Sequence, residues 1–120
     1  MQRVEDLLRN INFEKGGGLV PVIVQDAITK EILMLGYANR EALLKTIETG
    51  YAHFWSRSRD RLWMKGETSG NLLKVEEILI DCDGDSIIYI AKPSGPICHT
   101  GNKSCFFKSY RVSTTPLHHK

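Results

Sequence analysis

The chain has too few cysteines and too balanced a charge for several classes of protein. Its 120 residues include only three cysteines, an odd number that cannot all pair within one molecule. The net charge of +2 is too small to indicate a nucleic-acid or membrane partner. No apolar run approaches the roughly 20 residues of a membrane span. We therefore expect one domain over residues 1–120, with no membrane partner and no nucleic-acid partner.

The chain also shows no apolar signal-peptide core at its N-terminus, which begins Met1-Gln2-Arg3-Val4. We expect a cytoplasmic protein, whose thiols stay reduced. The composition, 42% hydrophobic and 25% charged, is ordinary for a globular domain. A domain of this size can bury a core without disulfides or metal. Reduced cysteines are thus available as thiolate ligands.

Hydrophobic periodicity predicts two short helices and several strands. The helices are expected at 4–11 and between the N-cap Asn39 and the C′ residue Gly50. The strands are expected at 19–25, 32–37, 51–56, 62–65, 72–80, 86–92 and 105–112, followed by a loose tail at 113–120. Because no helices alternate with the strands, we predict an α+β fold with a mainly antiparallel, curled, barrel-like sheet.

A dense acidic run, Asp81-Cys82-Asp83-Gly84-Asp85, separates two of these strands. In an extended backbone Asp81, Asp83 and Asp85 would point to one side, where they repel one another unless a cation lies among them. Hard carboxylates suit Mg²⁺, and a site with open positions could take a substrate phosphate. An EF-hand is poorly supported, because Gly84 stands at loop position four rather than six. The alternative is a solvated turn, since Asp-Gly-Asp is good turn chemistry.

The cysteines are Cys82, Cys98 and Cys105, and they form no Cys-x-x-Cys motif. Three thiolates would hold Zn²⁺ and leave its fourth position open, as catalytic zinc sites do. The alternative is that each cysteine is a small packing residue. His99 follows Cys98 and is a candidate general acid or base, although a lone histidine is more often a surface or core residue.

A third cluster, between residues 55 and 71, combines arginines, small hydroxyl residues and glycines. Guanidinium groups with hydroxyl donors suit phosphate. A charged hairpin tip is about as plausible, and the neighbouring tryptophans raise single-stranded nucleic-acid binding as another interpretation. The candidate substrate-binding residues are Trp55, Ser56, Arg57, Arg59, Lys65, Glu67, Thr68 and Ser69.

These clusters together resemble the phosphoribosyl-AMP cyclohydrolase family of histidine biosynthesis. The resemblance is carried by Met34-Leu35-Gly36-Tyr37-Ala38-Asn39, Phe54-Trp55-Ser56-Arg57-Ser58-Arg59, Leu62-Trp63-Met64-Lys65-Gly66-Glu67-Thr68-Ser69-Gly70-Asn71, the acidic run, Cys98-His99-Thr100-Gly101 and Ser104-Cys105-Phe106. The resemblance implies hydrolytic opening of the adenine ring of N1-(5-phosphoribosyl)-AMP, at the N1–C6 bond, by a zinc-activated water.

The resemblance further implies an obligate homodimer with sites at its interface. One Zn²⁺ would take Cys82 from one subunit and Cys98 and Cys105 from the other, while Asp81, Asp83 and Asp85 would bind Mg²⁺. Two alternatives stay open at this point: a zinc nucleobase deaminase, and a nonenzymatic RNA- or nucleotide-binding module using Trp55, Arg57 and Arg59. Copurifying zinc would argue against the binding module, and released ammonia would identify a deaminase.

Overall fold

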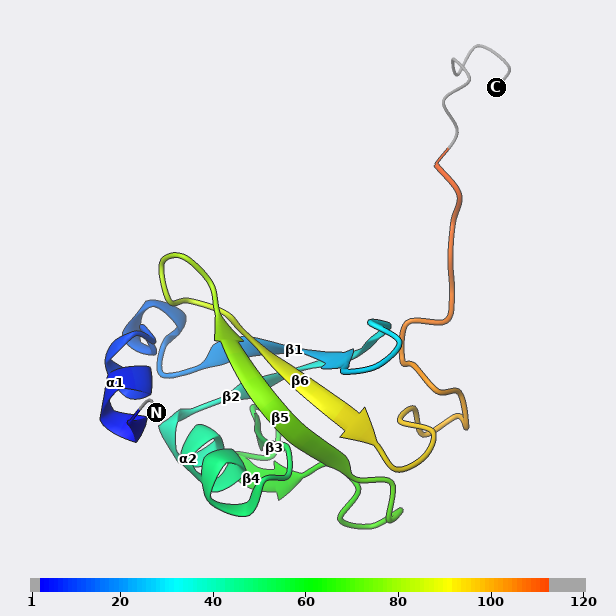
Figure 1. Cartoon of the computed structure of the whole chain (residues 1–120), viewed down its shortest axis with the longest axis horizontal. Helices are drawn as coiled ribbons and strands as arrows, with labels where there is room; N and C mark the ends of the chain where they lie inside the picture. The colour runs from blue at the N-terminus through cyan, green and yellow to red at the C-terminus, as the bar shows by residue number, and fades with distance from the viewer. Residues whose placement is uncertain (1–2, 113–120) are drawn as a thin grey trace.

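The computed structural model describes residues 3–112, as two helices, a 3₁₀ turn and six strands (Figure 1). The predicted loose tail, 113–120, lies outside the described residues. No helix within 3–112 has the length and apolar character to cross a bilayer. The elements, in order, are α1 (Val4–Arg9), η1 (Glu14–Gly16), β1 (Val20–Asp26), β2 (Ile32–Ala38), α2 (Arg40–Thr49), β3 (His53–Ser56), β4 (Arg61–Met64), β5 (Leu73–Ile80) and β6 (Ile87–Pro93).

The strands form two sheets, which corrects the prediction of one barrel-like sheet. Four strands lie in the order β2-β1-β6-β5, and β3 pairs with β4 in a separate two-stranded sheet. The pairs β1–β2, β5–β6 and β3–β4 are antiparallel, as predicted, but β1 and β6 are parallel. A parallel pair requires a long crossover. Here β2, α2, the β3–β4 hairpin and β5 lie between β1 and β6 in the chain. The sheet is open because its two edge strands, β2 and β5, do not pair with each other.

The core lies between the larger sheet, the hairpin and α2. Alternate residues of β1 point inward, so Val20, Val22 and Val24 are buried. Phe54 of β3 stacks on Trp63 of β4, with 5.0 Å between ring centroids. The predicted caps of α2 are confirmed: the Asn39 side chain accepts a hydrogen bond from the Ala42 N–H, and Gly50 adopts a left-handed conformation with φ 82°.

The final predicted strand, 105–112, is not formed. After a hydrogen bond from the Cys105 N–H to the Leu33 carbonyl, the chain leaves the body of the protein as an extended arm. Figure 1 shows this orange segment pointing away from both sheets. A strand needs a neighbouring strand to satisfy its backbone groups, and no strand within residues 3–112 pairs with this segment.

Strand β6 determines where the two candidate ligand sets lie. The acidic run forms the turn before β6, and Cys98 lies in the loop that follows it. At about 3.3 Å per residue, a seven-residue strand separates its two ends by roughly 20 Å. Figure 1 shows the β5–β6 turn close to α1 and the orange loop at the opposite end of the sheet.

Candidate active site

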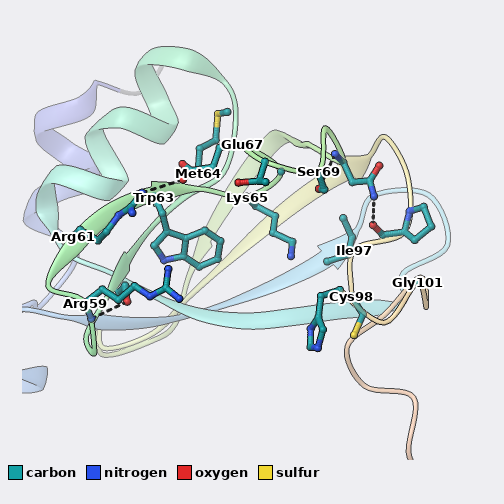
Figure 2. A pocket seen from close by; sticks show the side chains of 16 residues that line it. Arg59, Arg61, Trp63, Met64, Lys65, Glu67, Ser69, Ile97, Cys98 and Gly101 are labelled. Carbon is teal, nitrogen blue, oxygen red and sulfur yellow. Dashed lines mark hydrogen bonds and ion pairs between the residues drawn. The ribbon is translucent and has the colours of Figure 1, made fainter.

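A cavity of about 620 Å³ opens between the β4 end of the hairpin and the cysteine loop, residues 96–105. It is lined by most residues of the predicted substrate cluster and by two residues of the cysteine loop that were predicted from the sequence. These predicted residues are Ser56, Arg59, Lys65, Glu67, Thr68, Ser69, Cys98 and His99. Figure 2 shows Lys65 extending into the cavity between Trp63 and Cys98.

The hairpin side of the cavity is held by a tight turn after β4. The Glu67 carboxylate accepts hydrogen bonds from the Met64 N–H at 2.9 Å and from the Arg61 guanidinium at 3.1 Å. Gly66 has a φ of 88°, and a Cβ there would collide with the backbone of Asn71. The turn therefore needs a glycine at 66, and it orders Lys65 and Glu67 at the rim.

The cysteine loop is fixed to the sheet at both of its ends. Near its start, Asn71 donates from its side-chain amide to the Pro96 carbonyl at 2.8 Å. Near its end, the buried Ser104 donates its hydroxyl to the Ile32 carbonyl at 2.6 Å. Between them, Lys103 bridges Asp26 at 3.2 Å and Glu31 at 3.1 Å, so the β1–β2 turn anchors the loop.

Two of the three cysteines meet in this loop. Cys98 is buried and Cys105 is exposed, and the two thiols are close enough for each to shift the pKa of the other. The Thr100 hydroxyl, which donates to the Cys98 sulfur at 3.0 Å, lowers the pKa of Cys98, and Lys65 lowers it further. Partial burial of the Cys105 sulfur raises the pKa of Cys105, and the neighbouring Cys98 thiol raises it further. Cys98 is thus the readier thiolate.

Cys82 does not join them within one chain. It is exposed in the turn before β6, and no three-cysteine group occurs among residues 3–112. His99 is exposed beside Cys98 and lines the cavity. The structure thus brings together two of the predicted thiolate ligands and the predicted acid–base residue, and places the third thiolate elsewhere.

The acidic run is a tight turn rather than the extended segment assumed from the sequence. Asp81 Oδ1 accepts hydrogen bonds from the N–H groups of Asp85 at 2.9 Å and Ser86 at 3.3 Å. The turn nevertheless gathers the carboxylates: Asp81, Asp83 and Asp85 each offer an oxygen within 4.8 Å of the others. Lys15, which the sequence analysis did not single out, contacts Asp83 at 3.2 Å and Asp85 at 2.6 Å.

Crowding of these carboxylates shifts their proton affinities. Hydrogen bonds from the Asp85 carboxyl group and then from Ser86 lower the pKa of Asp81 to about 2. Lys15 lowers the pKa of Asp85, but Asp81 and Asp83 together outweigh it and leave that pKa raised. One ammonium group therefore does not neutralise the turn, whose donor set is the one a hard divalent cation takes.

Two predicted substrate-binding residues lie outside the cavity. Trp55 and Arg57 line a different hollow beside Tyr37, where the Arg57 guanidinium lies 3.9 Å from the Tyr37 ring centroid. In a strand, neighbouring residues point to opposite faces, so Trp55 faces away from Phe54. The other lining residues were not among the site residues predicted from the sequence, and they are Arg61, Trp63, Met64, Gly66, Asn71, Pro96, Ile97 and Gly101. Their position inside or beside the predicted clusters was the sequence feature that could have identified them.

Comparison with known proteins identifies the family to which the chain belongs. The sequence model of the family described as phosphoribosyl-AMP cyclohydrolase matches residues 34–107. A phosphoribosyl-AMP cyclohydrolase of Cenarchaeum symbiosum is 57% identical over 106 residues, covering 88% of this chain and 98% of the relative. One from Clostridium botulinum is 54% identical over 104 residues, covering 87% of this chain and 94% of the relative. The histidine biosynthesis bifunctional protein HisIE of Pyrococcus furiosus is 57% identical over 105 residues, which cover 88% of this chain and half of the relative.

The fold and these relatives define the protein class as an α+β hydrolase. More narrowly, the chain belongs to the phosphoribosyl-AMP cyclohydrolase family. The family match runs from β2 through the cysteine loop to Phe107, so it includes both candidate ligand sets and all residues that line the cavity.

Proposed function

We propose that this chain hydrolyses the N1–C6 bond of the adenine ring in N1-(5-phosphoribosyl)-AMP, as a step of histidine biosynthesis. Water adds its oxygen to C6, which becomes a carboxamide carbon, and N1 takes a proton as the ring opens. No other reactant is needed. Its family membership and the names of its relatives support this reaction.

The observation that carries the proposal is the composition of the cavity. Its volume of about 620 Å³ suits a nucleotide-sized ligand, since small-molecule sites span roughly 300–1,000 Å³. Among the lining residues, Arg59 and Lys65 supply positive charge, and Thr68 and Ser69 supply hydroxyl donors. Cys98 and His99 line the same cavity, so a bound nucleotide can meet both phosphate-binding and reactive groups.

The two ligand sets fit the two proposed metals. The paired thiols of Cys98 and Cys105, with Thr100 and Lys65 favouring the thiolate form of Cys98, suit Zn²⁺. Asp81, Asp83 and Asp85 suit Mg²⁺. A zinc ion held there would supply Lewis acidity that acidifies water toward neutrality. The free thiols that this requires are maintained in a reducing compartment such as the cytoplasm.

His99 is assigned to proton transfer. It is exposed, lines the cavity and directly follows Cys98, so its ring can reach atoms held at the thiols. Water that adds to C6 must lose a proton, and N1 must gain one. A neutral imidazole can accept the first proton and, once protonated, can donate the second. Lys65 and the ring of Trp63 border the same space and would orient the substrate.

We further propose that the zinc site is shared by two subunits of a homodimer. Within one chain, β6 separates Cys82 from Cys98 and Cys105. In a two-fold dimer, the turn of one subunit can face the cysteine loop of the other, and the relation then repeats to give two equal sites. The third thiolate would thus come from the partner subunit.

The reaction is tested by following ring opening of phosphoribosyl-AMP by absorbance, with the zinc-loaded protein and after chelation. Turnover that chelation abolishes and zinc restores is the expected result. Release of ammonia with the ring intact would identify a deaminase instead, and failure of the zinc-loaded protein to open the ring would overturn the proposal.

The shared site is tested by mixing two inactive variants, Cys82→Ala and Cys98→Ala, and allowing their subunits to exchange. A mixed dimer has one intact site and one doubly broken site. An equal mixture should therefore recover about a quarter of wild-type activity if the sites act independently. Each variant alone is the matched control. No activity after verified exchange would mean that the three cysteines do not form a shared site.

A further inference from the structure

The C-terminal arm, residues 105–112, is too apolar to be a solvated extension. Phe106 is 60% exposed, Phe107 46%, Tyr110 97% and Val112 90%. Scattered surface hydrophobics are normal, but four in seven consecutive residues form a patch of the kind that marks an interaction site. The arm also carries Lys108 and Arg111, neither of which forms an ion pair with any residue in 3–112.

The backbone of the arm has no partners within the described part of the chain. The Phe106 N–H donates to the Ser104 hydroxyl, but no hydrogen bond between residues 3–112 involves the backbone of 107–112. The arm is extended and rich in aromatic residues, which favour strands (Figure 1). It covers the residues predicted as a strand, but forms no strand within residues 3–112.

Strand β5 also has unpaired backbone groups, because it lies at the edge of the sheet. It is the last strand of the order β2-β1-β6-β5. Its first residues are covered on the outer side, because the Val75 N–H donates to the Gly50 carbonyl at 2.8 Å and the Ala52 N–H to the Leu73 carbonyl at 3.0 Å. No such bond reaches residues 76–80 from the rest of 3–112. An unpaired edge of this kind is a template for another strand.

A hollow of about 310 Å³ runs beside this free edge, between α1 and β5. It is lined by apolar side chains, Leu7, Ile78 and Ile80, and by the acidic Asp6 and Glu77. Asp6 is paired with Arg9, whereas Glu77 forms no ion pair within residues 3–112. The hollow thus offers apolar surface and one unpaired carboxylate to an arm that combines aromatic side chains with unpaired positive charges.

We propose that residues 106–110 of one subunit pair with residues 76–80 of β5 in a second copy of this chain, as an antiparallel fifth strand of its sheet. The direction rests on the proposed shared zinc site. There Cys105 lies beside Cys82 of the partner subunit, and Cys82 follows the end of β5 by two residues. An arm that starts at the end of β5 and follows its edge runs antiparallel to it. Main-chain hydrogen bonds then provide affinity, and the aromatic side chains fill the hollow.

The alternation of side chains supports this placement. Phe106, Lys108 and Tyr110 share one face of an extended arm, and Phe107 and Arg111 share the other. One face of the paired segment therefore presents Lys108 together with two aromatic rings, a combination that suits a hollow lined by apolar side chains and Glu77. Arg111 lies just beyond the paired residues. The metal site and the sheet would be completed by the same segment, so zinc binding and dimer formation become thermodynamically linked.

Amide hydrogen exchange on the zinc-loaded full chain tests the proposal. Amides in 76–80 and in 106–110 should exchange about tenfold or more slowly at concentrations where the protein is dimeric than where dilution makes it monomeric. Unprotected arm amides in the dimer would overturn the proposal. A chain ending at Phe107 should lose the protection at 76–80 and bind its partner at least about tenfold more weakly, while a control ending at Val112 should match the full chain.

A photo-crosslinker in place of Phe107 identifies the occupant of the edge. The expected product is a covalent dimer with the bond in residues 73–80 of the other subunit. A crosslink within one chain, a crosslink to another segment, or no covalent dimer would each overturn the proposal.

The shared zinc site and the pairing of the arm with β5 are tested by separate experiments, so either proposal can fail alone. If the mixed cysteine variants regain activity while the arm exchanges freely, the arm proposal fails and the shared site stands. If the mixture stays inactive but 76–80 and 106–110 are protected, the strand addition stands without the shared zinc.

Discussion

The two ends of β6 carry ligand sets of opposite character. The acidic turn before it is self-contained: Asp81 accepts the N–H groups of Asp85 and Ser86, and Lys15 contacts the other two carboxylates. The cysteine loop after it is well anchored but incomplete, with two thiols and a third that lies at the other end of the strand. Five consecutive residues thus gather the carboxylates of the proposed Mg²⁺ site, whereas the proposed three-thiolate site would need a second chain.

This difference shows which ligand set can form from neighbouring residues and which depends on residues far apart in the chain. A turn can gather carboxylates because side-chain to backbone hydrogen bonds act over a few residues. A three-thiolate site with ligands at 82, 98 and 105 cannot close locally when a rigid strand lies between the first two. The predictions that follow probe the two ends in turn, beginning with the largest expected effect.

The largest effect is expected from Cys98→Ala. The proposed zinc stoichiometry should fall from about one per subunit to nearly zero, and ring-opening activity should fall by about a thousandfold or more, because a Lewis acid contributes several kcal/mol. Metal analysis and the absorbance assay measure the two losses. Circular dichroism should be unchanged, since Cys98 lies in a loop outside the main core. Wild-type activity in this variant would refute the zinc mechanism.

Alanine variants of two glycines, one at each end of β6, test how much each end tolerates an added side chain. Gly84 in the acidic turn has φ 76°, and a Cβ there would collide with the Asn10 carbonyl; Gly101 in the cysteine loop has φ 93° but open space around it. Gly84→Ala should lower the free energy of unfolding by about 2–4 kcal/mol, from backbone strain plus overpacking. Gly101→Ala, the matched control, should cost only about 1 kcal/mol of strain. Equal losses in urea unfolding would show that the close approach to Asn10 is unimportant.

The ion pair between Asp26 and Lys103 anchors the cysteine loop, and its contribution to stability should decrease at acid pH. Burial acts to raise the pKa of Asp26, but the N–H groups of Ile28 and Thr29, with Lys103, more than offset it and leave the pKa lowered. Its contribution to stability is therefore present above the unfolded pKa of 3.8 and is lost as the pH falls below that value. Asp26→Asn should cost about 1–3 kcal/mol at pH 7.

Urea unfolding at several pH values measures this effect. The stability difference between wild type and Asp26→Asn should shrink as the pH falls from 5 toward 3. Glu31→Gln is the control, because Glu31 is a more exposed partner of Lys103 and should matter less. A difference that does not change with pH would exclude the carboxylate as its source.

The smallest effect is expected at the acidic turn from Asp83→Asn. This variant should weaken Mg²⁺ binding by about tenfold while zinc content stays unchanged, because hard and soft ligands serve different ions. Isothermal titration with Mg²⁺ and metal analysis for zinc measure the two quantities. Loss of zinc in this variant would show that the two ligand sets are not separate sites.

Much of this protein follows from local sequence. The helix at 40–49 begins and ends where Asn39 and Gly50 predict, and the three hairpins lie within a residue or two of their predicted bounds. These features depend on caps, turns and period-two patterns, which act between near neighbours. The family resemblance was equally readable, because its motifs are contiguous runs of residues, and the comparisons confirm it.

What the tertiary structure decided involves segments far apart in the chain. Periodicity could not show that β1 and β6 pair in parallel, since register between distant strands leaves no local pattern. Nor could it place Lys15 on the acidic turn or Lys103 on Asp26. The run 105–112 has the sequence of a strand and yet forms none here, because pairing depends on a neighbour with free backbone groups, and that neighbour is not determined by the segment itself.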